Sequence, residues 1–249
     1  MFLTLWNIYR FHSDYAALDG FDPETSPQGK NTPLDNWVLS RLSEVVNSTN
    51  QQFEDWDFHK ACRDIEEFVV NDVSNWYVRR SRRRLWEEAD SDDKLACQHT
   101  LHKVLVTVSR LIAPVSPFMS DAIHRNLEGE SVHMADWPNA GDVDTGIIET
   151  MALVRELAET GRRIRVEADR RQRLPCSEGW IVSGPDLSAF HEILAEETSF
   201  LNSDISKKDF ERFKKAEWCW IIDPLDGTNN FLNGLDYYSV CIALAHRGK

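Results

Sequence analysis

Apolar residues recur at steps of three and four along most of the first 165 positions, which is the period of amphipathic helices. The pattern predicts helices over residues 32–53, 57–88 and 91–113, with further helical segments at 116–127 and 147–165. Residues that commonly start helices stand at the beginning of two of these segments, namely threonine followed by proline at 32–33 and serine followed by two acids at 91–93. The first part of the chain is therefore expected to form an antiparallel helical bundle.

The pattern changes after about residue 175. Short apolar runs at 179–184, 218–222 and 239–245 are typical of strands, and residues 186–194 suit a helix. An Asn-Gly pair at 233–234 favours a turn between the last two strands. The fold class expected from the whole chain is mainly α, a helical bundle followed by a small α+β C-terminal fragment.

Composition limits the classes of function. The 249 residues carry a formal net charge of −13, so general affinity for polyanions is not expected and any contact with nucleic acid requires a local basic patch. No apolar run reaches membrane-spanning length, and the first residues do not resemble an export signal. Five scattered cysteines indicate neither a disulfide framework nor a zinc ribbon, which favours a reducing cytoplasm: Cys62, Cys97, Cys176, Cys219 and Cys241.

A local basic patch is present in the second predicted helix. Its guanidinium groups suit phosphate oxygens, and the neighbouring aromatic rings suit stacking on bases or riboses. The alternative is that some of these arginines pair with nearby acids while the aromatic residues fill the core. The candidate nucleic-acid-binding residues are Arg79, Arg80, Arg82, Arg83, Arg84 and Trp76, with Tyr77 and Trp86 beside them.

Cysteine and histidine residues offer little evidence of a metal site. Cys97, His99 and His102 are close in sequence, but their steps of two and three do not bring all three to one face of a helix. We therefore expect no metal site there, and we expect the isolated histidines to be structural or solvent-exposed: His12, His59, His124 and His133.

A second cluster with chemical potential lies near the C-terminus, where an apolar strand runs into Asp223 and Asp226. These carboxylates and the Leu225 carbonyl provide the hard oxygen ligands that Mg²⁺ prefers, and Pro224 stiffens the backbone between them. The amides of Gly227 and Thr228 would face a phosphate at the start of a helix. The alternative is a capped turn in which both aspartates satisfy backbone amides.

Residues 1–195 resemble the C-terminal anticodon-binding region of the isoleucyl-tRNA synthetase family. The resemblance rests on motifs that occur in family order: Leu-Trp-Asn-Ile-Tyr-Arg-Phe at 5–11, Trp-Tyr-Val-Arg-Arg-Ser-Arg-Arg-Arg-Leu-Trp at 76–86, Ala-Pro-Val-Ser-Pro-Phe-Met at 113–119 and Ser-Val-His-Met-Ala-Asp-Trp-Pro at 131–138. It implies a helical module that contacts the anticodon stem of tRNA, here the isoleucine isoacceptors. The chain departs from the family pattern over residues 163–176.

The same resemblance implies use of ATP in ligating isoleucine to tRNA, but the His-Ile-Gly-His and Lys-Met-Ser-Lys-Ser types of signature that hold ATP do not occur in these 249 residues. We therefore expect a tRNA-binding part of such an enzyme rather than the catalytic domain.

The block Asp-Pro-Leu-Asp-Gly-Thr-Asn-Asn-Phe at 223–231 resembles the metal-binding signature of the inositol monophosphatase family. The resemblance implies that Glu196, Asp223, the Leu225 carbonyl and Asp226 ligate Mg²⁺, that Gly227 and Thr228 bind phosphate, and that Thr228 helps orient the attacking water. The family also uses an aspartate from a downstream Trp-Asp block that this sequence does not contain, so weak Mg²⁺ binding without phosphatase activity is expected.

Together these resemblances predict three regions. A helical anticodon-binding-like bundle occupies residues 1–145, a helix and small α/β extension occupies 146–195, and a phosphatase-like fragment occupies 196–249. The interpretation is a fused or truncated reading frame joined near Glu196, with the oligomeric state left open.

Overall fold

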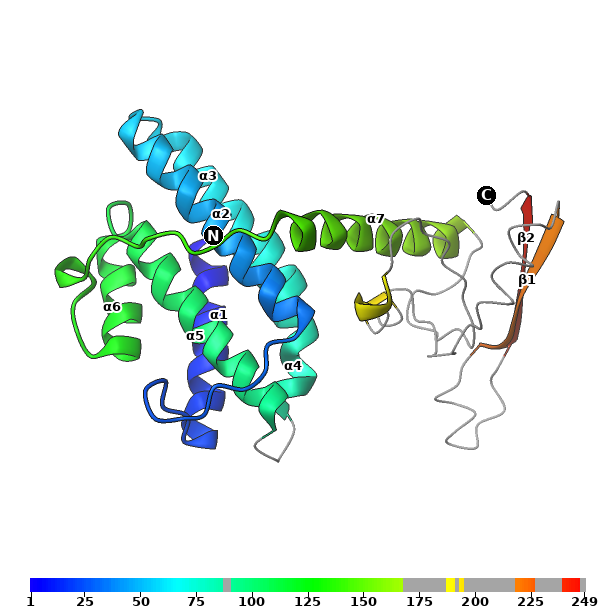
Figure 1. The fold of residues 1–249 in the computed structure, drawn as a ribbon, viewed down its shortest axis with the longest axis horizontal. Coiled ribbons are helices and arrows are strands. Elements are labelled where there is room, and N and C mark those ends of the chain that lie inside the picture. Colours follow the sequence, from blue (N-terminus) through cyan, green and yellow to red (C-terminus); the bar gives the residue numbers. More distant parts are fainter. Residues whose placement is uncertain (87–90, 168–186, 191–192, 195–217, 227–238, 247–249) are drawn as a thin grey trace. The chain divides into compact units, whose positions relative to one another are not determined.

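The computed structural model describes residues 1–86, 91–167, 187–190, 193–194, 218–226 and 239–246 (Figure 1). The chain divides into two units, Met1–Ile148 and Glu149–Lys249, and each is described by itself. The first unit contains α1 (Phe2–Asp19), α2 (Pro33–Glu54), α3 (Phe58–Glu67), the π-helix η1 (Phe68–Val78), α4 (Arg79–Trp86), α5 (Asp92–Ile112), α6 (Pro117–Glu128), the 3₁₀-helix η2 (Val132–Met134) and the start of α7 (Thr145–Glu167).

The helical bundle predicted from the apolar period is confirmed, and local signals fix where its helices begin. At the start of α2 the Thr32 hydroxyl accepts a hydrogen bond from the Asp35 amide, and the Asp35 carboxylate accepts one from the Thr32 amide. This reciprocal pair is a capping box. The Ser91 side chain caps α5 in a similar way by accepting from the Lys94 amide.

Helix α1 was not predicted. Its inner face contains a histidine among apolar residues, while large apolar side chains such as Leu3, 75% exposed, stand on its outer face. This mixture hides the 3.6-residue period on which the prediction depends. The helix ends at Gly20, whose φ of 65° is the left-handed conformation that glycine adopts without steric cost.

The predicted helix at 57–88 is continuous through residue 86 but not uniform. It begins as α3, widens into the π-helix η1 and returns to α-helical geometry in α4. A π-helix pairs residue i with residue i+5, so it changes the rotation at which later side chains leave the helix axis. The sequence period did not predict this segment.

The core of the first unit lies where α1 packs against η1 and α5, and where α2 packs against α3, η1 and α5. Large side chains from these helices are almost fully excluded from solvent. They include Leu5, Trp37, Ile65, Phe68, Tyr77, Leu101, Leu105 and Ile112.

In the second unit, strands β1 (Trp218–Asp226) and β2 (Ser239–His246) pair in antiparallel register, with Trp218 opposite His246 and Asp223 opposite Cys241. The pairing is irregular between Asp223 and Asp226. The strand predicted at 179–184 lies outside the described residues, as does most of the helix predicted at 186–194, of which the 3₁₀-helix η3 (Ser188–Phe190) is described.

One buried polar group in the core is His12, which is 2% exposed. Its ring lies 5.9 Å from the ring of His102, whose Nε2 is 3.3 Å from a carboxylate oxygen of Glu128. Burial, and secondarily the charge of His102, lower the pKa of His12 from 6.5 to about 3. His12 is therefore neutral in the folded protein at neutral pH.

The low pKa of His12 makes stability depend on pH. Between pH 6.5 and pH 3 the unfolded chain binds a proton at His12 that the folded chain does not bind, so stability falls as the pH falls. From pH 7 to pH 5 the free energy of unfolding is expected to decrease by roughly 2 kcal/mol through this group. Urea denaturation at both pH values measures this decrease in the free energy of unfolding. The His12→Leu variant should show a smaller decrease between pH 7 and pH 5. The control variant His59→Leu, at an exposed position, should show the same decrease as the unaltered protein. An unchanged slope in His12→Leu would contradict this assignment.

Candidate nucleic-acid interface

The arginine-rich helix α4 continues directly from η1 without a break in helical backbone. Its sequence from Arg79 to Trp86 contains five arginines in eight residues. Only those guanidinium groups that face solvent are available to contact nucleic acid.

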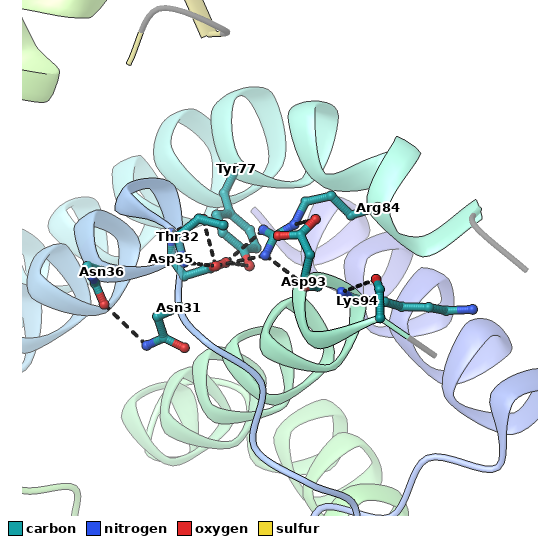
Figure 2. Close-up of polar contacts among 9 residues, drawn as sticks. Asn31, Thr32, Asp35, Asn36, Tyr77, Arg84, Asp93 and Lys94 are labelled. Atoms are coloured by element: carbon teal, nitrogen blue, oxygen red, sulfur yellow. Dashed lines mark hydrogen bonds and ion pairs between the residues drawn. The ribbon is translucent and has the colours of Figure 1, made fainter. Parts of the chain in front are cut away.

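Arg84 faces the core. It donates two parallel hydrogen bonds, each 2.8 Å long, to the two carboxylate oxygens of Asp35, which is fully buried (Figure 2). It also donates from Nε to the Asp93 carboxylate at 2.9 Å and from Nη2 to the Asp93 carbonyl at 2.9 Å. This forked geometry uses the donor pattern that only arginine offers.

Asp35 is the centre of a network that joins three parts of the chain. Besides Arg84, the Tyr77 hydroxyl and the Thr32 hydroxyl donate to its carboxylate, and Figure 2 shows all three converging on it. Burial alone would raise the pKa of Asp35, but the hydrogen bonds and charge of Arg84 lower it below the usual range. The pair is therefore fully ionised at neutral pH.

Arg80 also lies inside the bundle, where it is 6% exposed. Its guanidinium carbon is 3.2 Å from the centre of the Trp76 ring, and it donates a hydrogen bond of 2.7 Å to the Trp76 carbonyl. Trp76 itself is only 5% exposed. Of the residues predicted to bind nucleic acid, Arg80, Arg84 and Trp76 are thus occupied within the fold.

The remaining three arginines, Arg79, Arg82 and Arg83, are exposed on α4. Trp86, 58% exposed, follows them at the next turn. Positions i, i+3, i+4 and i+7 share one face of a helix, so these four residues form a single surface, which we call the arginine stripe. The sequence offers Trp76, Tyr77 and Trp86 as rings for stacking, with Trp76 as the candidate binding residue; of these, Trp86 is exposed and Trp76 is buried.

Cys97, His99 and His102 have structural contacts. Burial raises the pKa of the Cys97 thiol to about 11, which keeps it protonated at neutral pH. The His99 ring contacts the Ser26 and Pro27 carbonyls at 3.2 and 3.1 Å. Within the described parts of the chain, no group of three or more histidine, cysteine or acidic residues is placed to hold a metal ion.

The residues of the predicted magnesium and phosphate site are less fully described. Glu196, Gly227 and Thr228 lie outside the described residues, and Asp223, Leu225 and Asp226 belong to β1, of which only the backbone is described. Two carboxylates and a carbonyl remain a donor set that suits Mg²⁺. No helix among the described residues is long and apolar enough to cross a membrane.

Comparison with known proteins agrees with the helical architecture. The family described as "Anticodon-binding domain of tRNA ligase" matches residues 35–178, and the inositol monophosphatase family matches residues 187–249. Because the first match covers more than half of the chain, the protein belongs to the anticodon-binding domain family of tRNA ligases.

Individual relatives are isoleucine–tRNA ligases. The chain is 43% identical over 177 residues to isoleucine–tRNA ligase 2 of Bacillus cereus, a match that covers 70% of this chain and 17% of that protein. It is 36% identical over 218 residues to the isoleucine–tRNA ligase of Methanosarcina mazei, covering 82% of this chain and 20% of that protein. The chain thus spans about a fifth of the length of the curated relatives it matches.

The network around Asp35 can be tested by substitution. Asp35→Ala would leave the Arg84 charge buried beside fewer partners, and breaking a buried pair in this way typically costs about 3–5 kcal/mol. A loss of this size in the free energy of unfolding at pH 7 is expected in chemical denaturation. The matched control is Asn47→Ala on the exposed face of the same helix, which should change stability by less than about 0.5 kcal/mol. Equal effects of both variants would refute a central role for Asp35.

Proposed function

We propose that this chain binds tRNA through the arginine stripe on α4, with preference for isoleucine isoacceptors. The observation that carries the proposal is the orientation of α4: Arg79, Arg82, Arg83 and Trp86 share its exposed face. Three guanidinium groups with an exposed indole provide phosphate contacts and a stacking surface, which are the two components of binding to RNA loops. Membership of the anticodon-binding family and the similarity to isoleucine–tRNA ligases support the choice of ligand.

The acidic net charge of the whole chain does not prevent RNA from binding at the arginine stripe. The chain has a net charge of −13, yet binding depends on the local potential within about one Debye length, near 10 Å at 0.1 M salt. Two acids near the helix, Asp35 and Asp93, are engaged by Arg84 from its inner side, while Glu87 and Glu88 directly follow Trp86 in the sequence and lie outside the described residues. The outer face of α4 can therefore present positive charge to a phosphate backbone.

Phosphate contacts should be visible in the salt dependence of binding. In fluorescence anisotropy with an isoleucine tRNA, replacing Arg79, Arg82 and Arg83 together by alanine is expected to weaken binding about 10- to 100-fold at ~0.1 M salt and to reduce the salt slope by up to about 3. A control with the same change in charge replaces the exposed Arg10, Arg63 and Arg125 by alanine. The proposal is wrong if both triple variants lose the same affinity and slope.

The same binding assay distinguishes the contribution of base stacking on Trp86 from the contribution of the arginine charges. Trp86→Ala is expected to weaken tRNA binding roughly tenfold, because a stacked base contributes about 1–3 kcal/mol, while the salt slope stays unchanged. Trp86→Phe should restore most of the affinity, since the ring face is retained. If Trp86→Ala changed the salt slope of tRNA binding but left the affinity at low salt unchanged, the result would argue against stacking.

Ligation of isoleucine with ATP is implied by the family resemblance and belongs to proteins about four times the length of this chain. The part proposed here is tRNA recognition within such an activity, in the cytoplasm.

The match to the inositol monophosphatase family supports a second candidate, Mg²⁺-dependent phosphate chemistry in residues 187–249. The proposed ligands are Glu196, Asp223, the Leu225 carbonyl and Asp226, with Gly227 and Thr228 toward the phosphate. Asp226→Asn separates the two functions because it removes one proposed metal ligand and leaves α4 unchanged. Release of phosphate from inositol monophosphate that this variant abolishes would establish the second candidate; unchanged tRNA binding in the same variant is expected from the first.

A further inference from the structure

A second exposed surface of the first unit lies at the turn between α2 and α3. Four aromatic rings meet there in a row: Trp56 and Phe58 have centroids 5.7 Å apart, Phe58 and Phe53 5.3 Å, and Phe53 and Trp137 5.4 Å. Trp56 is 80% exposed, Phe58 44% and Trp137 39%. We call this surface the aromatic tip.

The backbone at Trp56 is unfavourable for tryptophan. Helix α2 ends with the Asp57 amide donating to the Gln52 carbonyl at 2.8 Å and the Trp56 amide donating to the Phe53 carbonyl at 3.2 Å. This is the Schellman arrangement, whose left-handed position is usually glycine. Trp56 occupies that position with a φ of 61°, which is the single positive φ of a non-glycine residue among those described. A bulky residue in a strained, solvent-facing position is a feature associated with function.

A pocket of about 200 Å³ adjoins the tip at its other end. Its lining includes Trp137, Arg110, Pro114 and Val132. The indole of Trp137 is held in place because its Nε1–H donates to the Asn50 side chain and its ring meets Phe53 nearly at a right angle. The surface thus combines a fixed aromatic wall, an exposed indole and a pocket whose lining mixes apolar residues with charged and polar ones, Arg110, Asp136 and His133. Tryptophan and arginine are the residue types most enriched in protein-binding hot spots.

The charged residues around the aromatic tip indicate what kind of partner it can bind. Glu54, Asp55 and Asp57 adjoin Trp56 in the chain and are all exposed, with the exposed Lys60 one turn further on, so acids outnumber bases at this end of the surface. At the pocket Asp136 lies opposite in charge to Arg110, so neither sign dominates there. These acids disfavour RNA and favour a segment with positive charge. The aromatic tip therefore differs from the arginine stripe in the sign of its charge as well as in its position.

We propose that the aromatic tip binds a segment of another protein that carries an apolar side chain flanked by lysine or arginine residues. The apolar side chain enters the pocket beside Trp137, and the basic residues lie against Glu54, Asp55 and Asp57. The tip and the stripe stand at opposite ends of the continuous helix formed by α3, η1 and α4 (Figure 1), separated by on the order of 30 Å of helix. Both surfaces can therefore be occupied at the same time.

The test uses a synthetic ten-residue peptide of alternating lysine and leucine, with two matched peptides in which glutamate replaces lysine or serine replaces leucine. Binding to the whole chain is followed by the indole N–H signals of Trp56 and Trp137 in NMR spectra. Saturable shifts below about 1 mM peptide are expected for the lysine–leucine peptide alone.

The decisive variant is Trp56→Gly, because glycine relaxes the left-handed backbone while it removes the indole. It should keep or raise the melting temperature and weaken peptide binding about tenfold or more. Trp86→Ala should leave peptide binding unchanged, and Trp56→Gly should leave tRNA binding unchanged.

Three results would overturn the proposal. The first is absence of saturable binding below 1 mM, or equal binding of the glutamate peptide. The second is a shift of the Trp56 and Trp137 indole signals on addition of tRNA alone, without peptide, which would assign the tip to RNA. The third is self-association in sedimentation experiments that Trp56→Gly abolishes, which would assign the tip to a second copy of this chain.

Discussion

The buried contact between Asp35 and Arg84 is the interaction on which the rest of the first unit depends. One carboxylate closes the capping box of α2, accepts the Tyr77 hydroxyl from η1 and receives the forked guanidinium of α4. Arg84 continues the network to Asp93 at the start of α5. A buried ion pair adds little net stability compared with well-packed apolar residues, but it accepts only one arrangement of the elements that it joins. It therefore fixes the rotation of α4.

That rotation divides the arginines into two groups with different chemistry. Arg84 and Arg80 turn inward, where a carboxylate and an indole compensate the loss of hydration. Arg79, Arg82 and Arg83 turn outward as a consequence of the helical period. The contacts of the inner arginines thus hold α4 in the orientation that places the outer arginines at the surface. This is how a chain with many more acids than bases can present a local basic surface.

The long helix from α3 to α4 has exposed surfaces of different charge at its two ends. At the basic end a short stripe of side chains projects from α4, and at the acidic end a strained turn presents Trp56 beside the rings of Phe58 and Phe53. The π-helical segment between them sets the relative rotation of the two ends. A single continuous element therefore presents two exposed surfaces of different charge at its two ends.

The sequence by itself determined the helical bundle and most helix boundaries, because apolar periodicity and capping residues such as Thr32 and Ser91 are local signals. It also identified the arginine-rich helix as the candidate interface. It did not reveal α1, whose inner face includes His12, or the π-helix η1. Above all, only the tertiary structure decided which arginines face solvent and that Trp86 rather than Trp76 is exposed. The reason is that this choice depends on Asp35, which is 49 residues from Arg84 in sequence but in direct contact with it in the fold.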